Sequence, residues 1–395
     1  MLKITLIITL VSLSGCFFSI HKPEHGIAQL AHTSHKDSAA HDLSDQTATL
    51  RYRLEQSGAF HNDQEFNEIT SRIISKLPLN LNGIKPKAQL VRNPSINAFS
   101  LYDGTICVNS GLVARLTNPD QLAFVLAHEA AHWTLQHGLA RYRTTTNTLL
   151  LAQLADTLVT PLASRFKLKA VAERGIDLAS LTSFSIYSQE LELEADKIGI
   201  EAMTNAGYNP LKALSVLRLL KSSSTAEDAS SSEHFISNHP DTDQRLALME
   251  EELAKTEKIT RGDIAEIDPR FIRKTADIRL ANASWAYRAG YFIEALNNLR
   301  IMELALTDRG RSHIRSRLHL EKAAIYLAMA RDLSFVKTTI DPTEWKQLYH
   351  TRRDEDVRLE WCREGFKNLD KVRHPSSLVK KARETKAVAG CDKVS

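Results

Sequence analysis

Residues 118–138 read NPDQLAFVLAHEAAHWTLQHG and mark both ends of a single helix. Asn118 can cap the N-terminus, Pro119 suits the first helical position, and Gln121 can complete a capping box. Gly138 can end the helix, so we predict that it runs from about Pro119 to His137. The helix should be buried, because it carries the apolar residues Leu122, Phe124, Val125 and Leu126.

The chemistry of this helix lies in His128-Glu129-Ala130-Ala131-His132. The two histidines are four positions apart, so both imidazoles face one side of the helix and can bind one zinc ion. Glu129 can then act on a water bound at that ion. The alternative is a helix with two surface histidines and a solvated glutamate, but a buried histidine pair needs a partner. We therefore predict a metal site here.

A catalytic zinc site needs a third protein ligand and an open position. The segment Glu192-Leu193-Glu194-Ala195-Asp196 lies on a helix that Ser188 is expected to cap. Glu192 and Asp196 share one face, so Glu192 can ligate while Asp196 accepts the ring N–H of a ligating histidine. Glu194 points elsewhere and is expected to be solvated. Together the two motifs predict a metalloprotease.

The pairing of His128-Glu129-x-x-His132 with Glu192-x-x-Ala195-Asp196 resembles the zinc metallopeptidase family of CAAX prenyl proteases, HtpX and periplasmic BepA-type proteins. The resemblance covers roughly residues 60–255. Within it, Asn97-Ala98-Phe99 and residues 108–112 resemble the edge-strand hairpin of the family, and His239-Pro240 followed by Arg245 resembles its His-Pro turn. The long membrane helices of the prenyl-protease and HtpX branches are not found, so prenylated substrates are not implied.

The resemblance implies a gluzincin that binds one Zn²⁺ per chain and hydrolyses internal peptide bonds. Glu129 would take a proton from the attacking water and deliver it to the leaving amine. Substrate is expected to pair with the hairpin edge. Arg245 either helps to stabilise the oxyanion or forms a salt bridge. His239 follows a Ser-rich stretch, 222–232, and either plugs the metal site, donates to the oxyanion, or packs at a helix start.

The flanking sequence predicts an α+β, mainly α fold in which a zincin-type domain contains a small antiparallel hairpin sheet. Asp103-Gly104 is a hairpin signal between two short apolar segments. Further strands and helices are expected at 62–77, 88–91, 144–165, 188–207 and from about 241. Beyond residue 261 the chain stays helical, and residues 285–299 faintly resemble a tetratricopeptide unit. An ordinary helical bundle explains that region equally well.

The N-terminus predicts export. A lysine at position 3 precedes an apolar run too short to span a bilayer. Leu13-Ser14-Gly15-Cys16 resembles a bacterial lipobox, so Cys16 would carry lipid and begin the mature chain, and Phe17 points to the outer membrane. An ordinary cleaved signal is the alternative. The expected divisions are a signal peptide (1–15), a flexible tether (16–50), a zinc metalloprotease domain (51–260) and a helical C-terminal domain (261–395).

Composition limits the remaining classes of protein. The chain has 395 residues, 43% of them hydrophobic, and a formal net charge of +4, so it is globular and has no basic field for nucleic acid. Export permits disulfides. We predict one between Cys362 and Cys391, while Cys107 is expected to be a buried thiol in a strand.

The sequence therefore predicts a lipid-anchored zinc endopeptidase of the periplasm that degrades misfolded or misassembled envelope proteins. The alternative is an outer-membrane assembly factor or chaperone with secondary proteolysis, whose helical C-terminal region binds assembly machinery. A zinc hydrolase that acts on cell-wall peptides is a third hypothesis.

Overall fold

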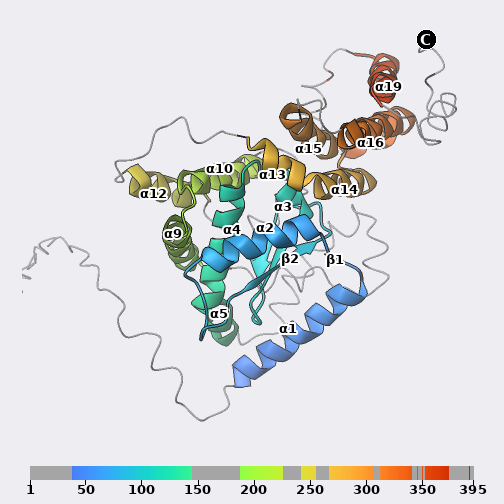
Figure 1. Cartoon of the computed structure of the whole chain (residues 1–395). Coiled ribbons are helices and arrows are strands. Elements are labelled where there is room, and N and C mark those ends of the chain that lie inside the picture. Colours follow the sequence, from blue (N-terminus) through green and yellow to red (C-terminus); the bar gives the residue numbers. More distant parts are fainter. Residues whose placement is uncertain are drawn as a thin grey trace, which may run out of the picture. The chain divides into compact units, whose positions relative to one another are not determined.

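The structure is a computed structural model that describes residues 38–144, 187–225, 242–254, 267–306, 312–339 and 352–372, with Trp345, Tyr349 and Cys391. The described residues from Ala39 onward form one compact unit. It is mainly helical and contains one small sheet (Figure 1). The α+β, mainly α class predicted from the sequence is confirmed.

Four strands form the sheet, in the order β1-β2-β4-β3: β1 Phe60–His61, β2 Lys87–Val91, β3 Ala98–Ser100 and β4 Thr105–Asn109. The predicted Asp-Gly hairpin joins β3 and β4, which pair antiparallel. The sheet as a whole is mixed rather than antiparallel, because β2 pairs with β4 in parallel. From β2 the chain continues to β3, which forms an edge of the sheet, and then turns back as β4, which lies between β2 and β3. Strand β4 therefore runs in the same direction as β2.

The sheet is covered on both faces. Leu90, Ile106 and Val108 belong to the large hydrophobic core, which also includes helices α2 (Gln64–Lys76) and α4 (Pro119–Thr134). The alternate residues Val91 and Cys107 point to a second cluster. Leu50 and Leu54 of α1 (Ser38–Gln56) complete that cluster.

The sequence predicted a flexible tether over residues 16–50, but residues 38–50 belong to helix α1. Its buried residues Leu43, Thr47, Leu50 and Leu54 recur at helical spacing. The residues between them are mostly polar, so the mean hydropathy of the segment is low. Composition alone therefore does not indicate that the segment forms an amphipathic helix. The rest of the predicted tether lies outside the described residues.

Helix α4 has the predicted start and an earlier end. The Asn118 side chain accepts a hydrogen bond from the Asp120 amide at 2.8 Å, and Gln121 closes the capping box. The helix ends at Thr134 instead of continuing to His137, because Gln136 adopts a left-handed conformation with φ of 57°. A new helix, α5 (His137–Thr144), then begins at the histidine.

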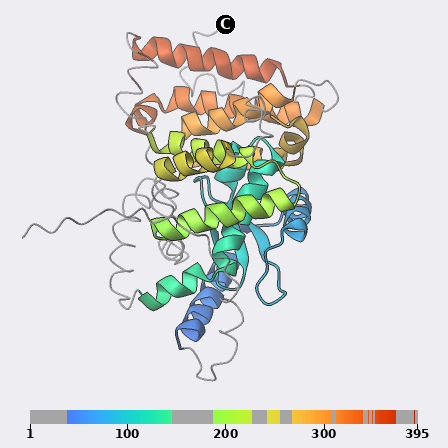
Figure 2. The same cartoon turned by 90° about the vertical axis from the view of Figure 1, so that its left-hand side faces the viewer.

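Three helices between residues 189 and 254 pack near α4, and the first of them carries the motif with Glu192 and Asp196. They are α9 Gln189–Asn205, α10 Leu211–Thr225 and α12 Thr242–Ala254. Figure 2 shows them, green to yellow, as neighbouring helices. The predicted core helix at 144–165 lies almost entirely outside the described residues, and so does the predicted domain boundary at residue 260.

The C-terminal region is helical, as predicted, and contains α13 Pro269–Lys274, α14 Ala276–Arg288, α15 Phe292–Ala305, α16 Ser312–Arg331, α17 Leu333–Thr339 and α19 Asp354–Asp370. The run expected from residue 285 to 299 contains a turn at Gly290, whose φ is 93°. Cys362 and Cys391 form a disulfide with a Cα–Cα distance of 5.6 Å. Within the described segments, every helix is too short or too polar to cross a bilayer.

Buried polar contacts join this region to the segment that precedes α4. The Arg279 guanidinium donates to the carbonyl oxygens of Ala114, at 2.6 Å, and Leu116. These carbonyls lie at the C-terminal end of α3 (Ser110–Arg115). Burial lowers the pKa of Arg279 to about 9. The Ser110 hydroxyl donates to Asn282 Oδ1 at 2.7 Å.

Candidate metal centre

The two motifs predicted from the sequence meet in the interior of the protein. His128 and His132 project from α4, and Glu192 projects from the first turn of α9. The Glu192 oxygens lie 3.5 Å from His128 Nε2 and 3.4 Å from His132 Nε2. The ligand atoms of the three residues all lie within 4.8 Å of one another. All three side chains are buried.

The close approach of α9 to α4 depends on Gly199, which no local motif marks. A Cβ atom added to Gly199 would lie 3.1 Å from the His128 amide nitrogen and 3.2 Å from its Cα. Few real Cβ contacts are so short, so a larger residue would push the helices apart. Gly199 lies three positions after Asp196 on α9, and that spacing on the acid-bearing face is the signal that could have identified it.

Asp196 orients the first histidine. Its Oδ1 lies 3.0 Å from His128 Nδ1, which leaves the Nε2 atom facing Glu192. Such a contact fixes the tautomer and the ring orientation of a metal-binding histidine. Burial disfavours the Asp196 carboxylate, but Arg245 and His128 outweigh burial and lower the pKa of Asp196 to about 2. Asp196 is therefore ionised and can hold the ring.

Arg245 of α12 connects both acidic residues. Its Nε and Nη2 atoms donate to Asp196 at 2.7 and 2.8 Å. Its Nη1 lies 2.9 Å from Glu192, and the side chain is only 1% exposed. The contacts are those of the salt-bridge alternative for Arg245 rather than those of an oxyanion donor. Arg245 therefore positions the carboxylates of Asp196 and Glu192.

The second histidine, His132, has two further neighbours, His137 and Tyr187. His137 Nδ1 lies 2.9 Å from His132 Nδ1, and His137 Nε2 lies 3.4 Å from Glu194. Glu194 is about half exposed, as expected, but it takes part in this chain of contacts. The Tyr187 ring stacks on the His132 ring with centroids 3.9 Å apart. No local motif marks Tyr187 as part of the site.

Glu129 is buried beside these groups. Burial is the main reason that the pKa of Tyr187 is raised, and the charges of Glu129 and Glu192 raise it further. The same two carboxylates help to keep Arg245 charged against burial. Glu129 therefore belongs to the charged cluster around the histidines.

The electrostatics of the site fit a cation. Burial disfavours a charged imidazole, yet hydrogen bonds with Asp196 and Glu192 raise the pKa of His128 to about 10. The surroundings of His128 therefore stabilise positive charge. Two imidazole nitrogens and one carboxylate oxygen on two helices are also a donor set that zinc accepts. A divalent cation can supply the charge that protonation otherwise supplies.

One further predicted residue, Cys107, lies in the described part of the chain, away from the three candidate ligands. Cys107 is fully buried in β4, where burial raises the pKa of its thiol. His239 and Cys16 lie outside the described residues, so their predicted roles stay predictions.

The chain is similar in sequence to a known peptidase family and to several named proteins. Residues 61–253 match the family model described as peptidase family M48. The chain is 30% identical over 196 residues to the beta-barrel assembly-enhancing protease of Yersinia pestis. This match covers 47% of this chain and 37% of the relative. It is 27% identical over 241 residues to the protein of the same name in Escherichia coli strain K12, covering 58% and 45%.

A mitochondrial relative is also similar. The chain is 25% identical over 177 residues to the mitochondrial metalloendopeptidase OMA1 of Schizosaccharomyces pombe, covering 45% of this chain and 49% of the relative. The chain thus spans less than half the length of each of these three relatives.

Proposed function

We propose that this chain, whose residues 61–253 match the model of peptidase family M48, is a zinc-dependent metalloendopeptidase of the bacterial periplasm. Its proposed substrates are misfolded or misassembled envelope proteins. The observation that supports the activity is the buried convergence of His128, His132 and Glu192, with Asp196 and Arg245 behind them.

The three converging residues would hold one Zn²⁺ per chain. When bound, zinc supplies a Lewis acid that polarises the scissile carbonyl and lowers the pKa of water towards about 7. Asp196 keeps the His128 ring in the orientation that presents Nε2, and Arg245 keeps Asp196 and Glu192 in place. These residues preorganise the site before substrate binds.

Glu129 is the proposed general base. Its carboxylate would take a proton from the attacking water and then deliver that proton to the leaving amine. Strand β3 lies at one edge of the described sheet, next to α4. A substrate strand that pairs with β3 would be held through its backbone, which tolerates many sequences. Unfolded chains are substrates of this kind.

The test is the purified full-length chain with casein as substrate. We expect one zinc per chain, loss of cleavage on chelation, and recovery when zinc is restored. Glu129→Gln should lose activity by a factor of about 10² to 10⁴, the usual contribution of a general base, and keep its zinc. Glu190→Gln is the control, because Glu190 is exposed on the first turn of α9. Zinc-free protein, or full activity in Glu129→Gln, would overturn the proposal.

A role in assembly is the second candidate. Two relatives are named beta-barrel assembly-enhancing proteases. This chain also has helices beyond residue 253, and Arg279 and Asn282 fasten them to the protease domain. We propose that they bind outer-membrane assembly machinery, with a tetratricopeptide-like arrangement as one hypothesis. If assembly is the main function, Glu129→Gln should restore barrel assembly in cells that lack the protein.

The proposed attachment is a lipid at Cys16, supported by the Leu13-Ser14-Gly15-Cys16 sequence. A lipid-anchored protein partitions with outer membranes, and Cys16→Ser should release it into the soluble periplasmic fraction. Fractionation with immunodetection measures this. Unchanged processing and membrane association of Cys16→Ser would contradict the anchor.

A further inference from the structure

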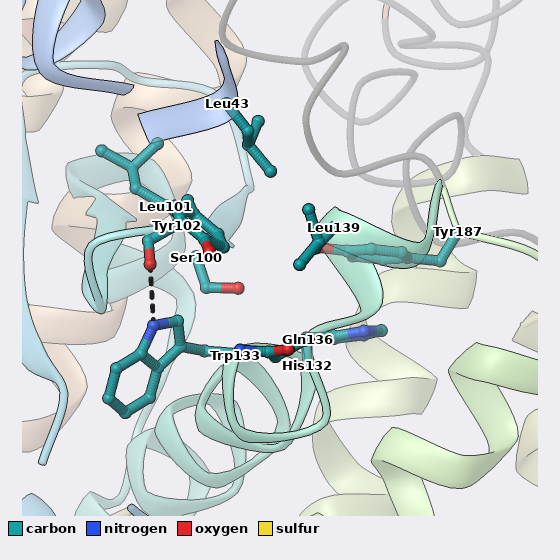
Figure 3. Close-up of a pocket in the computed structure, with 10 residues that line it drawn as sticks. Leu43, Ser100, Leu101, Tyr102, His132, Trp133, Gln136, Leu139 and Tyr187 are labelled. Atoms are coloured by element: carbon teal, nitrogen blue, oxygen red, sulfur yellow. Dashed lines mark hydrogen bonds between the residues drawn. The ribbon is translucent and has the colours of Figure 1, made fainter. Parts of the chain in front are cut away.

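A small apolar pocket lies beside the candidate metal centre (Figure 3). Its cavity volume is about 20 Å³, which is enough for one water molecule or a group of similar size. The pocket is lined on one side by His132, by Tyr187 and by Leu139, the last of which belongs to α5. Ser100 of β3 lines it on another side. Leu43 of α1 is also one of its lining residues.

The position of the pocket connects it to the proposed reaction. The Tyr187 ring that lines it stacks on His132, one of the candidate metal ligands. Ser100 is the last residue of the edge strand β3. Side chains of a strand that pairs with β3 would project alternately to either face of the extended sheet. One of them can therefore reach a pocket that begins at Ser100 and ends at His132.

Leu43 comes from outside the segment that matches the peptidase family, which begins at residue 61. Several contacts fix its helix in place. Leu50 and Leu54 pack in the cluster on the sheet. Arg51 Nη1 lies 3.0 Å from Asp103 Oδ2 in the hairpin turn.

A further hydrogen bond fixes α1 close to Leu43. Gln46 Nε2 donates to the Tyr142 hydroxyl of α5 at 2.9 Å. The helix therefore spans from the sheet to α5, and Leu43 is buried between them. The side chain of Leu43 is not part of the cluster that contains Leu50 and Leu54, and it faces the pocket.

We propose that this pocket receives an apolar side chain of the substrate polypeptide next to the scissile bond, and that Leu43 sets the size of side chain it accepts. The inference rests on the proposed endopeptidase function. With Leu43 in place the cavity admits only a small group, so the protein prefers alanine over leucine or phenylalanine at this position. Helix α1 thus adds a specificity-determining residue to the family domain.

The experiment uses the full-length, zinc-loaded protein and a fluorogenic peptide series. Each peptide is based on one site that the wild-type protein cleaves in casein. Ala, Leu or Phe is placed in turn at each of the two residues on either side of the scissile bond. Leu43→Ala enlarges the pocket, Leu43→Phe fills it, and Leu50→Ala removes the same atoms from the same helix away from the pocket.

At one of these positions, Leu43→Ala should raise kcat/KM for Leu and Phe relative to Ala by about tenfold or more, the usual effect of a methylene-scale change in an apolar pocket. Leu43→Phe should lower the same ratios. Leu50→Ala should leave them at the wild-type values, although it also creates a cavity. If Leu43→Ala fails to fold, Leu43→Val should give a smaller change in the same direction.

Two results overturn the inference while leaving the proposed function intact. One is wild-type ratios in both Leu43 variants that fold and cleave. The other is an equal change in Leu50→Ala, which would show a general loosening of α1. A wild-type protein that holds zinc and cleaves no peptide or casein would instead overturn the proposed function, and this inference with it.

Discussion

Replacement of Arg245 by methionine tests whether the buried ion cluster holds the site together. Methionine keeps most of the length of the arginine stem but removes the charge and all of its donors. Asp196 would lose two hydrogen bonds, at 2.7 and 2.8 Å, and Glu192 would lose a contact at 2.9 Å. Both carboxylates are fully buried, so water cannot replace the guanidinium.

The magnitude follows from this burial. Removing one partner of a buried ion pair costs about 3–5 kcal/mol, because the remaining charge is left uncompensated. We expect a loss of this size in the free energy of unfolding of the metal-free protein. Arg245→Lys keeps the charge but cannot make the bidentate contact with Asp196. The free energy of unfolding should therefore fall by less in Arg245→Lys than in Arg245→Met. A loosened Asp196 should also lower zinc affinity by about 10- to 100-fold.

The assay is urea denaturation of chelator-treated protein, followed by zinc titration. The matched control is Arg218→Met, which removes an arginine whose 2.6 Å contact with Glu250 is exposed. An exposed pair contributes at most about 1 kcal/mol. If Arg245→Met and Arg218→Met lose the same small amount, the reasoning about the buried cluster is wrong.

Two further predictions concern Gly199 and the disulfide. Gly199→Ala gains about 1 kcal/mol of helix propensity but incurs overpacking against His128 of about 1–3 kcal/mol. Its free energy of unfolding should therefore fall by up to about 2 kcal/mol, and its zinc affinity should fall as well. Gly138→Ala, with an ordinary 3.8 Å contact to Tyr187, should bind zinc normally; equal affinities in a titration would contradict this. Replacing Cys362 and Cys391 by serine opens a 29-residue loop, which should lower the free energy of unfolding by roughly 3–4 kcal/mol and leave casein cleavage unchanged. Wild-type stability that is insensitive to a reductant would refute this last prediction.

The candidate metal ligands could be predicted from the sequence because their signals are local. His128 and His132 share a face through helical periodicity alone, and Glu192 and Asp196 do so for the same reason. The capping box at Asn118 likewise depends on residues within a few positions. The Asp103-Gly104 hairpin is another local choice of backbone conformation. Such features are present before any tertiary contact forms.

The tertiary structure decided what these residues contact. Arg245 was equally consistent with an oxyanion donor and a salt bridge, and only the packing of α12 against α9 brings it to Asp196. The parallel pairing of β2 with β4 depends on where the chain crosses the sheet edge, which short-range patterns do not specify. Gly199, Tyr187 and Leu43 acquire their roles from contacts with distant parts of the chain. A local pattern fixes which face of a helix a side chain occupies, whereas its partner depends on how whole elements pack to bury their apolar faces.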